Sequence, residues 1–179
     1  MKFQKLLLRT LFGCLLVGAS GAAMAKGPKN DCPQGVVLGE VLIGDLVVKN
    51  KDCLIQDAIV MGNVRVDNKG KPGVIFIMRD VVVNGEVTVK GASAVIAQTV
   101  VVENLSVEET VLETVVTETL ILGPGDMVFK DNQQVLIYHN VVQDGDIQCV
   151  GNINPFTDPV GAVAVDNVVY NGNITCFGQ

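Results

Sequence analysis

The stretch Asp80-Val-Val-Val-Asn-Gly-Glu-Val-Thr-Val89 decides the fold, because copies of it return along the whole chain. The clearest second copy is Asn167-Val-Val-Tyr-Asn-Gly-Asn-Ile-Thr-Cys176. Aligned on the glycine position, the copies centre on Gly44, Gly62, Gly85, Glu103, Glu118, Gly145 and Gly172, at intervals of 18, 23, 18, 15, 27 and 27 residues. A fixed motif at variable spacing predicts a repeated structural unit with loops of variable length.

Within each copy, apolar and polar residues alternate. The residue three before the anchor is β-branched in all seven copies, and the residues two and four after it are apolar or cysteine. Around Gly85 these are Val82, Val87 and Val89, and Thr88 is the polar residue between the last two. A period of two is typical of strands with one buried face.

Two columns of turn residues punctuate the repeat. One is the anchor with the polar residue that follows it, and the other stands five residues earlier, at Gly39, Asp57, Asp80, Gln98, Glu113, Asn140 and Asn167. A unit of about 20 residues with two corners cannot bury a core alone and must stack on its neighbours. The sequence therefore predicts an all-β, single-domain parallel β-solenoid (β-helix) of about seven coils. We expect it to be right-handed, because the coil lengths vary and the strict hexapeptide spacing of left-handed helices is absent.

Further strands are predicted upstream of the motif, at residues 74–78, 94–97, 135–138 and 162–165. Each coil would then hold two or three short strands. At roughly 4.8 Å per coil, seven coils would form a rod about 30 to 35 Å long.

Residues 1–25 are predicted to be a secretory signal peptide, which leaves residues 26–179 as the mature domain. Lys2, Lys5 and Arg9 precede an apolar run at residues 11–18, and Ala23-Met-Ala25 offers a cleavage site. A lipoprotein signal at Cys14 is the alternative. No later run is long and apolar enough to predict a membrane span. The expected location is secreted or periplasmic.

The charge of the chain disfavours nucleic-acid binding. Thirteen Lys and Arg stand against 19 Asp and Glu, a net charge of −6, and loss of the signal would remove three basic residues. The mature domain would then carry about −9, which repels phosphate backbones.

Four cysteines remain after the predicted cleavage. Cys149 and Cys176 occupy the same place in consecutive copies of the motif, and Cys32 and Cys53 lie about one coil apart near the other end. Neighbouring coils bring Cα atoms within the separation that a disulfide tolerates. We therefore predict the bridges Cys32–Cys53 and Cys149–Cys176; metal binding is the alternative, although no CxxC spacing is present.

This arrangement resembles a group of small secreted bacterial β-helix proteins of uncharacterised function with paired terminal cysteines. The residues that carry the resemblance are the Cys32 to Cys53 pair, the Val-rich coils, and the closing segments Gly145-Asp-Ile-Gln-Cys149 and Gly172-Asn-Ile-Thr-Cys176. More distantly, the short coils resemble the polymer-forming bactofilins. The first group implies no activity, and the second implies self-association.

The polar residues can be interpreted as catalytic or as structural. A polysaccharide lyase or glycosidase would need converging carboxylates, or calcium held by several acids. Asp57 and Asp80 share one column, and Asp45 and Asp146 share another, but turn residues explain both. The acidic residues Glu103, Glu108, Glu109, Glu113 and Glu118 could share one face and gather a cation, or form a solvated face. His139, the only histidine, is interpreted as structural.

Two segments are expected to leave the solenoid as loops, residues 123–134 and 151–161. Phe129 and Lys130 in the first, and Phe156 and Asp158 in the second, are candidate contact residues, because loops on a rigid scaffold often carry specificity. No cofactor and no catalytic or metal-binding residue is predicted. The expected function is a non-catalytic structural or interaction module with an unknown protein or glycan partner. The alternatives are a carbohydrate-active or carbohydrate-binding β-helix protein and a self-assembling, bactofilin-like module.

Overall fold

The computed structural model describes residues 31–68, 71, 73–153 and 162–176. Within these residues the chain forms 21 short strands, arranged in three parallel sheets of seven strands each, and one 3-10 turn, η1 (Pro33–Gly35). Each coil of the chain adds one strand to sheet B, then one to sheet C, then one to sheet A.

Sheet B contains β1 (Val36–Leu38), β4 (Cys53–Gln56), β7 (Ile75–Arg79), β10 (Ser93–Ala97), β13 (Thr114–Thr117), β16 (Val135–Tyr138) and β19 (Ala162–Val165). Sheet C contains β2 (Val41–Ile43), β5 (Ile59–Met61), β8 (Val82–Val83), β11 (Val100–Val101), β14 (Leu120–Pro124), β17 (Val141–Asp144) and β20 (Val168–Asn171). Sheet A contains β3 (Leu46–Lys49), β6 (Val64–Asp67), β9 (Val87–Lys90), β12 (Leu105–Glu108), β15 (Met127–Lys130), β18 (Ile147–Val150) and β21 (Ile174–Thr175).

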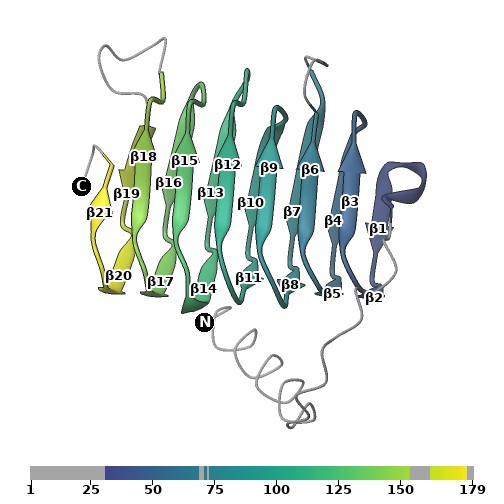
Figure 1. Cartoon of the computed structure of the whole chain (residues 1–179), viewed down its shortest axis with the longest axis horizontal. Helices are drawn as coiled ribbons and strands as arrows, with labels where there is room; N and C mark the ends of the chain where they lie inside the picture. The colour runs from purple at the N-terminus through teal and green to yellow at the C-terminus, as the bar shows by residue number, and fades with distance from the viewer. Residues whose placement is uncertain (1–30, 69–70, 72, 154–161, 177–179) are drawn as a thin grey trace, which may run out of the picture.

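The coils follow one another along a rod in sequence order, from β1–β3 at one end to β19–β21 at the other (Figure 1). The predicted all-β parallel β-solenoid is confirmed, and seven strands per sheet agree with the predicted number of coils. Six steps between seven strands, at roughly 4.8 Å each, give the stack a length of about 29 Å.

The core fills the inside of the rod, where every second residue of each strand points. In β9, for example, Val87 and Val89 are fully buried, whereas Thr88 and Lys90 face outward. The largest fully buried side chains include Phe76 on sheet B and Phe129 on sheet A. Burial of these inward-pointing side chains is the main favourable contribution to the free energy of folding, because they form the apolar core of the coils.

The expectation that Phe129 lies on an exposed loop is wrong. Met127–Lys130 form strand β15, and the Phe129 side chain is 0% exposed between Val107 and Cys149 of the adjacent coils. Alignment of the fifth copy of the motif on Glu118 leaves residues 123–134 outside the repeat, and this is the reason for the loop prediction. Met127 pairs with Leu105 and with Ile147, which makes Gly125 the anchor of this coil.

An irregularity in β14 explains the misalignment. The pairing of β14 with β17 shifts between Ile121 and Pro124, so this coil holds extra residues just before its anchor. Glu118 lies instead at the corner between sheets B and C, where its φ is +48°. With the correct register, the intervals between successive sheet A strands are 18, 23, 18, 22, 20 and 27 residues, read from Leu46, Val64, Val87, Leu105, Met127, Ile147 and Ile174.

The second turn column is corrected in its last three members. At the corner between sheets B and C, the residues with positive φ are Gly39, Asp57, Asp80, Gln98, Glu118, His139 and Asp166. Glu113, Asn140 and Asn167 were predicted for the last three places. Asn140 and Asn167 come one residue after the corner and turn toward the inside of the rod.

Glycine recurs at the anchor because successive coils approach most closely there. A Cβ atom added at Gly62 would lie 2.6 Å from the carbonyl carbon of Gly44, and one at Gly125 would meet the carbonyl oxygen of Glu103. Backbone atoms cannot yield as the end of a flexible side chain can, so a larger residue would push the coils apart.

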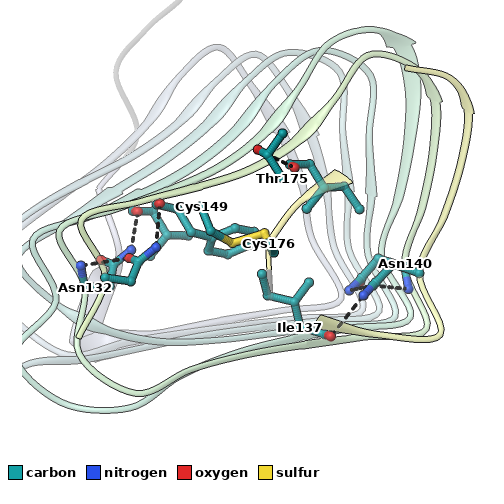
Figure 2. Close-up of a disulfide and its surroundings, with 11 residues drawn as sticks. Asn132, Ile137, Asn140, Cys149, Thr175 and Cys176 are labelled. Atoms are coloured by element: carbon teal, nitrogen blue, oxygen red, sulfur yellow. Dashed lines mark hydrogen bonds between the residues drawn. A yellow bond between two sulfur atoms is a disulfide. The ribbon is translucent and has the colours of Figure 1, made fainter. Parts of the chain in front are cut away.

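Asparagine side chains close two of the corners from inside (Figure 2). Asn140 Oδ1 accepts a hydrogen bond from the Thr119 backbone N–H at 2.9 Å, and its Nδ2 donates to the Val116 carbonyl at 3.0 Å. Asn132 acts likewise on Thr110 and Val107 at the corner between sheets A and B. These bonds satisfy backbone groups that the turns leave unpaired, which would otherwise be costly in a buried place.

Both predicted disulfides are present, one in each terminal region. Cys32 and Cys53 have a Cα–Cα distance of 6.1 Å, and Cys149 and Cys176 one of 5.0 Å. The second bridge lies inside the outline of the coils (Figure 2). Each bridge links adjacent coils where the stack has a neighbour on only one side, so it restrains fraying at the ends.

We expect replacement of both Cys149 and Cys176 by Ser to lower the free energy of unfolding by about 3 to 4 kcal/mol, from the chain-entropy cost of the 27-residue loop. Hydrogen exchange should show the loss of protection mainly in β18 to β21. The matched change at Cys32 and Cys53 should affect the opposite end. Uniform loss of protection along the rod in either variant would contradict this local role.

We expect Phe129→Ala to destabilise the fold by about 3 to 5 kcal/mol, because it empties a fully buried site. Lys130→Ala, a change of the exposed neighbouring residue, should cost well under about 1 kcal/mol. Urea unfolding of both variants would measure the difference. Equal stabilities would mean that Phe129 is on the surface, as a loop position would require.

Candidate functional site

The outer faces of the three sheets differ sharply in chemistry. On sheet A the last outward column alternates in sign, through Lys49, Asp67, Lys90, Glu108 and Lys130 in neighbouring coils. Lys90 Nζ lies 3.0 Å from Glu108 Oε2 and 3.0 Å from Glu109 Oε1. Opposite charges on adjacent strands stabilise the pairing, so sheet A has the character of a solvated face.

This charge pairing shifts the titration of its members. The hydrogen bond from Lys90 is the main reason why the pKa of Glu108 lies below its ordinary value, and Ser106 adds a second hydrogen bond. The hydrogen bonds to Glu108 and Glu109 raise the pKa of Lys90. The carboxylate of Glu108 therefore contributes stability above its unfolded-state pKa, and this contribution is lost as the pH falls through the lower folded-state value.

Sheet C carries little charge: Asp144, the exposed last residue of β17, is the only charged residue within its seven strands. Its outward positions form two columns across the seven coils, and we call them together the apolar face: Val41, Ile59, Val82, Val100, Leu120, Val141 and Val168 in the first, and Ile43, Met61, Asn84, Val102, Leu122, Gln143 and Tyr170 in the second. Twelve of these 14 side chains are apolar or aromatic and two are amides. An outer face of this length with so little charge is unusual for a soluble strand surface.

The apolar face is most exposed at its two ends. Ile43 is 69% exposed on the first coil and Tyr170 is 70% exposed on the last. Between them, Met61 and Leu122 remain 38% and 40% exposed, whereas Val100 near the middle is only 4% exposed. The exposed apolar side chains therefore lie in two groups, on β2 and β5 at one end and on β14 and β20 toward the other, with half-buried or buried apolar residues of β8 and β11 between them.

Sheet B has a weaker version of the same feature. Its central outward column is apolar in all seven strands, at Val36, Leu54, Ile77, Val95, Val115, Leu136 and Val163. These side chains are mostly half-buried, and the neighbouring outward column includes Gln56, Arg79 and Thr117. Sheet C is therefore the stronger candidate for a binding surface.

Acidic residues border the apolar face on both long sides. The corner between sheets B and C and the turn residues beside it carry Glu40, Asp57, Asp80, Glu118 and Asp166; the corner between sheets C and A carries Asp45, Glu86, Glu103, Asp126, Asp144 and Asp146. We call these two rows the acidic rims. They hold 11 of the 19 carboxylates of the chain, so the face is framed by negative charge.

Backbone contacts between coils hold the rim beside sheet A in place. Asp126 Oδ1 accepts from the Asp146 N–H at 2.8 Å, and Asp146 Oδ1 accepts from the Asn173 N–H at 2.8 Å. Asn63 and Asn104 fill equivalent places in other coils. A carboxylate bound to the next coil in this way has a fixed position beside the apolar face.

The acidic residues Glu103, Glu108, Glu109, Glu113 and Glu118 do not form one cluster. Glu103 belongs to the corner between sheets C and A, Glu118 to the corner between B and C, and Glu108, Glu109 and Glu113 lie near the corner between A and B. Among the described residues, no group of three or more His, Cys, Asp or Glu is placed to hold a metal ion. The idea of one acidic face is therefore wrong, because the coil distributes these residues over three corners.

The remaining acidic pairs and the histidine lie at corners. Asp57 and Asp80 stack in adjacent coils, as predicted, and both have a positive φ. His139 is another member of that column, with Nε2 at 3.4 Å from Asp166 Oδ2 and its ring edge-on to Tyr138. All of these side chains occupy turn positions on a convex edge of the rod.

The predicted contact loops contribute little to this surface. Phe129 is in the core, and Lys130 ends β15 on the solvated sheet A. Phe156 and Asp158 lie outside the described residues. Sequence reasoning missed the apolar face, although a signal was present: in consecutive pairs such as Val82-Val83 and Val168-Val169, only one apolar residue can point inward.

We expect Lys90→Gln to raise the pKa of Glu108 toward its ordinary value, because its main hydrogen-bond donor is removed. Lys130→Gln should raise the pKa of Glu108 less, since Lys130 makes no hydrogen bond to Glu108 and lowers its pKa only by a weaker coulombic interaction. Titration of the Glu108 side-chain signals by NMR would measure both. A larger effect of Lys130→Gln would contradict the assigned cause.

No helix among the described residues is long and apolar enough to cross a membrane. Comparison with protein-family models, with curated proteins and with solved structures found no match. The resemblance to small secreted β-helix proteins therefore rests on the motif and cysteines alone. What the fold and its geometry support is a β-solenoid protein with two disulfides.

Proposed function

We propose that this protein is a non-catalytic interaction module that works outside the cytoplasm, and that the apolar face of sheet C is its binding surface. The observation that carries the proposal is that the seven strands of sheet C contain a single charged residue, Asp144 at the end of β17, in a chain in which 18% of the residues are charged. Exposed apolar side chains gathered on one face of a sheet are typical of interaction sites.

Folding alone does not account for the apolar face. The core is filled from inside by the opposite set of residues, for example Val60, Val83 and Ile121 on the same strands, all 0% exposed. Single exposed apolar residues are normal on protein surfaces. Two apolar columns that continue through successive coils leave apolar surface in contact with water, and a bound partner would cover it.

The solenoid also supports the proposal by its rigidity. Every strand of sheet C between the ends is hydrogen-bonded to a neighbour on both sides, and the disulfides restrain the terminal coils. A surface that is ordered before binding loses little conformational entropy when a partner docks. The scaffold would therefore present the apolar face ready for binding.

The two disulfides indicate an oxidising compartment outside the cytoplasm, because cytosolic thiols are kept reduced. Secretion or a periplasmic location agrees with this and with the signal peptide predicted for residues 1–25.

Stacking of whole rods end to end is disfavoured by the structure of the first coil. Its inward residues Val37 and Leu46 are 1% and 0% exposed and Leu42 of β2 is half-buried, so most of the core at this end is covered. Lys51 Nζ donates to the Cys32 carbonyl at 2.8 Å and pairs with Asp31 at 2.8 Å, which fastens the segment before β1 to the next coil. Incoming strands would have to displace this segment.

Site-specific photocrosslinking in producing cells would test the proposal. A photoreactive phenylalanine analogue placed at Met61 or Leu122 should give a discrete adduct, and the same analogue at Val128, a half-buried outward position on sheet A, should give none. Ile59→Lys on the apolar face should abolish the adduct. Equal labelling from all three positions, or none from sheet C, would contradict the assignment; an adduct of twice the chain mass would indicate self-association.

A further inference from the structure

The acidic rims restrict what can bind to the apolar face. Resting on the function proposed above, we infer that the partner is an amphipathic α-helix with basic residues along both edges of its apolar stripe. The inference identifies the chemistry of the partner, which the apolar columns alone leave open.

The charge around the face supports a basic partner. Eleven carboxylates flank it, and Glu40, Asp57, Glu103, Asp144 and Asp166 among them are exposed. Among the described residues, the basic side chains near these rims are few. Arg65 Nη2 lies 3.4 Å from Glu86 Oε1, Arg79 directly precedes Asp80, and His139 Nε2 lies 3.4 Å from Asp166 Oδ2. Charged groups at the edge of an interface favour partners of opposite sign and penalise partners of like sign.

The dimensions of the face suit a helix that lies along the rod. Seven coils give a length of about 29 Å, which a helix of about 19 residues would match at 1.5 Å per residue. The two outward columns stand about 7 Å apart, because they are two residues apart along each strand. Such a helix would cross the strands of sheet C, and its edges would come above the two acidic rims.

Other occupants fit the charge less well. A second copy docked face to face would bring the acidic rims of both molecules together, and like charges at an interface are costly. An anionic lipid surface would meet the same repulsion. An added β-strand would need a free sheet edge, and the edges of sheet C lie only at β2 and β20, the two ends of the rod.

Fluorescence anisotropy with two synthetic peptides would test the inference on the purified, disulfide-bonded protein. Both peptides have 18 residues and leucine at helical spacing, and they differ in carrying lysine or glutamate along the flanks. We expect the lysine peptide to bind at least about tenfold more tightly than the glutamate peptide. Its affinity should fall when sodium chloride is raised from about 50 to about 500 mM, because salt screens exposed charges.

Two variants with equal changes in net charge separate the rims from the charge of the whole molecule. The rim variant combines Asp57→Asn, Glu103→Gln, Asp144→Asn and Asp166→Asn. The control variant combines Asp67→Asn, Glu109→Gln, Glu113→Gln and Asp131→Asn, which lie away from sheet C. The rim variant should bind the lysine peptide about fivefold to tenfold more weakly, and the control should change its affinity less than about twofold.

A third variant, Ile59→Lys with Leu122→Lys, tests the apolar face itself and should abolish binding of the lysine peptide. Circular dichroism and thermal melting would confirm that each variant is folded. Equal binding of both peptides, lost in the third variant, would overturn the inferred charge of the partner and keep the face as a binding surface. Binding that the third variant leaves unchanged would overturn both proposals. Failure of both peptides to bind would overturn the inferred helix, and the crosslinking result would then stand alone.

Discussion

In-register hydrogen bonding between successive coils is the constraint on which this structure depends. Each strand pairs in parallel with the equivalent strand one coil before and one coil after, in all three sheets. A residue is therefore stacked on its equivalent in the next coil at roughly 4.8 Å. The same steric and electrostatic constraints therefore act on equivalent positions in every coil. For this reason the structure is described by columns of stacked residues. The anchor column is the strictest case, because a Cβ at Gly62 would meet the backbone of Gly44.

Stacking at this distance also governs the charged and polar columns. Like charges in adjacent coils repel each other, and the outer column of sheet A avoids this by alternating sign from Lys49 to Lys130. At the corner between sheets C and A, acidic residues do stack, as Asp126 and Asp146 show. There the backbone N–H of the next coil donates to each carboxylate and offsets part of the repulsion. Asn140 and Asn167 solve the related problem inside the rod with neutral amides.

The same geometry explains how the apolar face arises. A solenoid turns a short repeated pattern into a continuous surface, and sheet C extends two apolar columns through seven coils. The flanking corners need polar turn residues for their own backbone conformation, and in this chain many of them are acidic. An apolar face framed by carboxylates follows from these two choices together. The disulfides at the two ends keep that face ordered by holding the terminal coils in register.

The sequence by itself determined the parallel solenoid of about seven coils and both disulfides, because period-two alternation and repeated spacing are local signals of a stacked fold. Four predicted upstream strands appear within a residue of their expected bounds as β7, β10, β16 and β19. Only the tertiary structure decided the register of the fifth coil, where the irregularity in β14 moves the anchor from Glu118 to Gly125 and buries Phe129. It alone also decided which member of each apolar pair faces outward, since that depends on where the chain bends. The apolar face could therefore be recognised only from the tertiary structure, which fixes the positions of the corners.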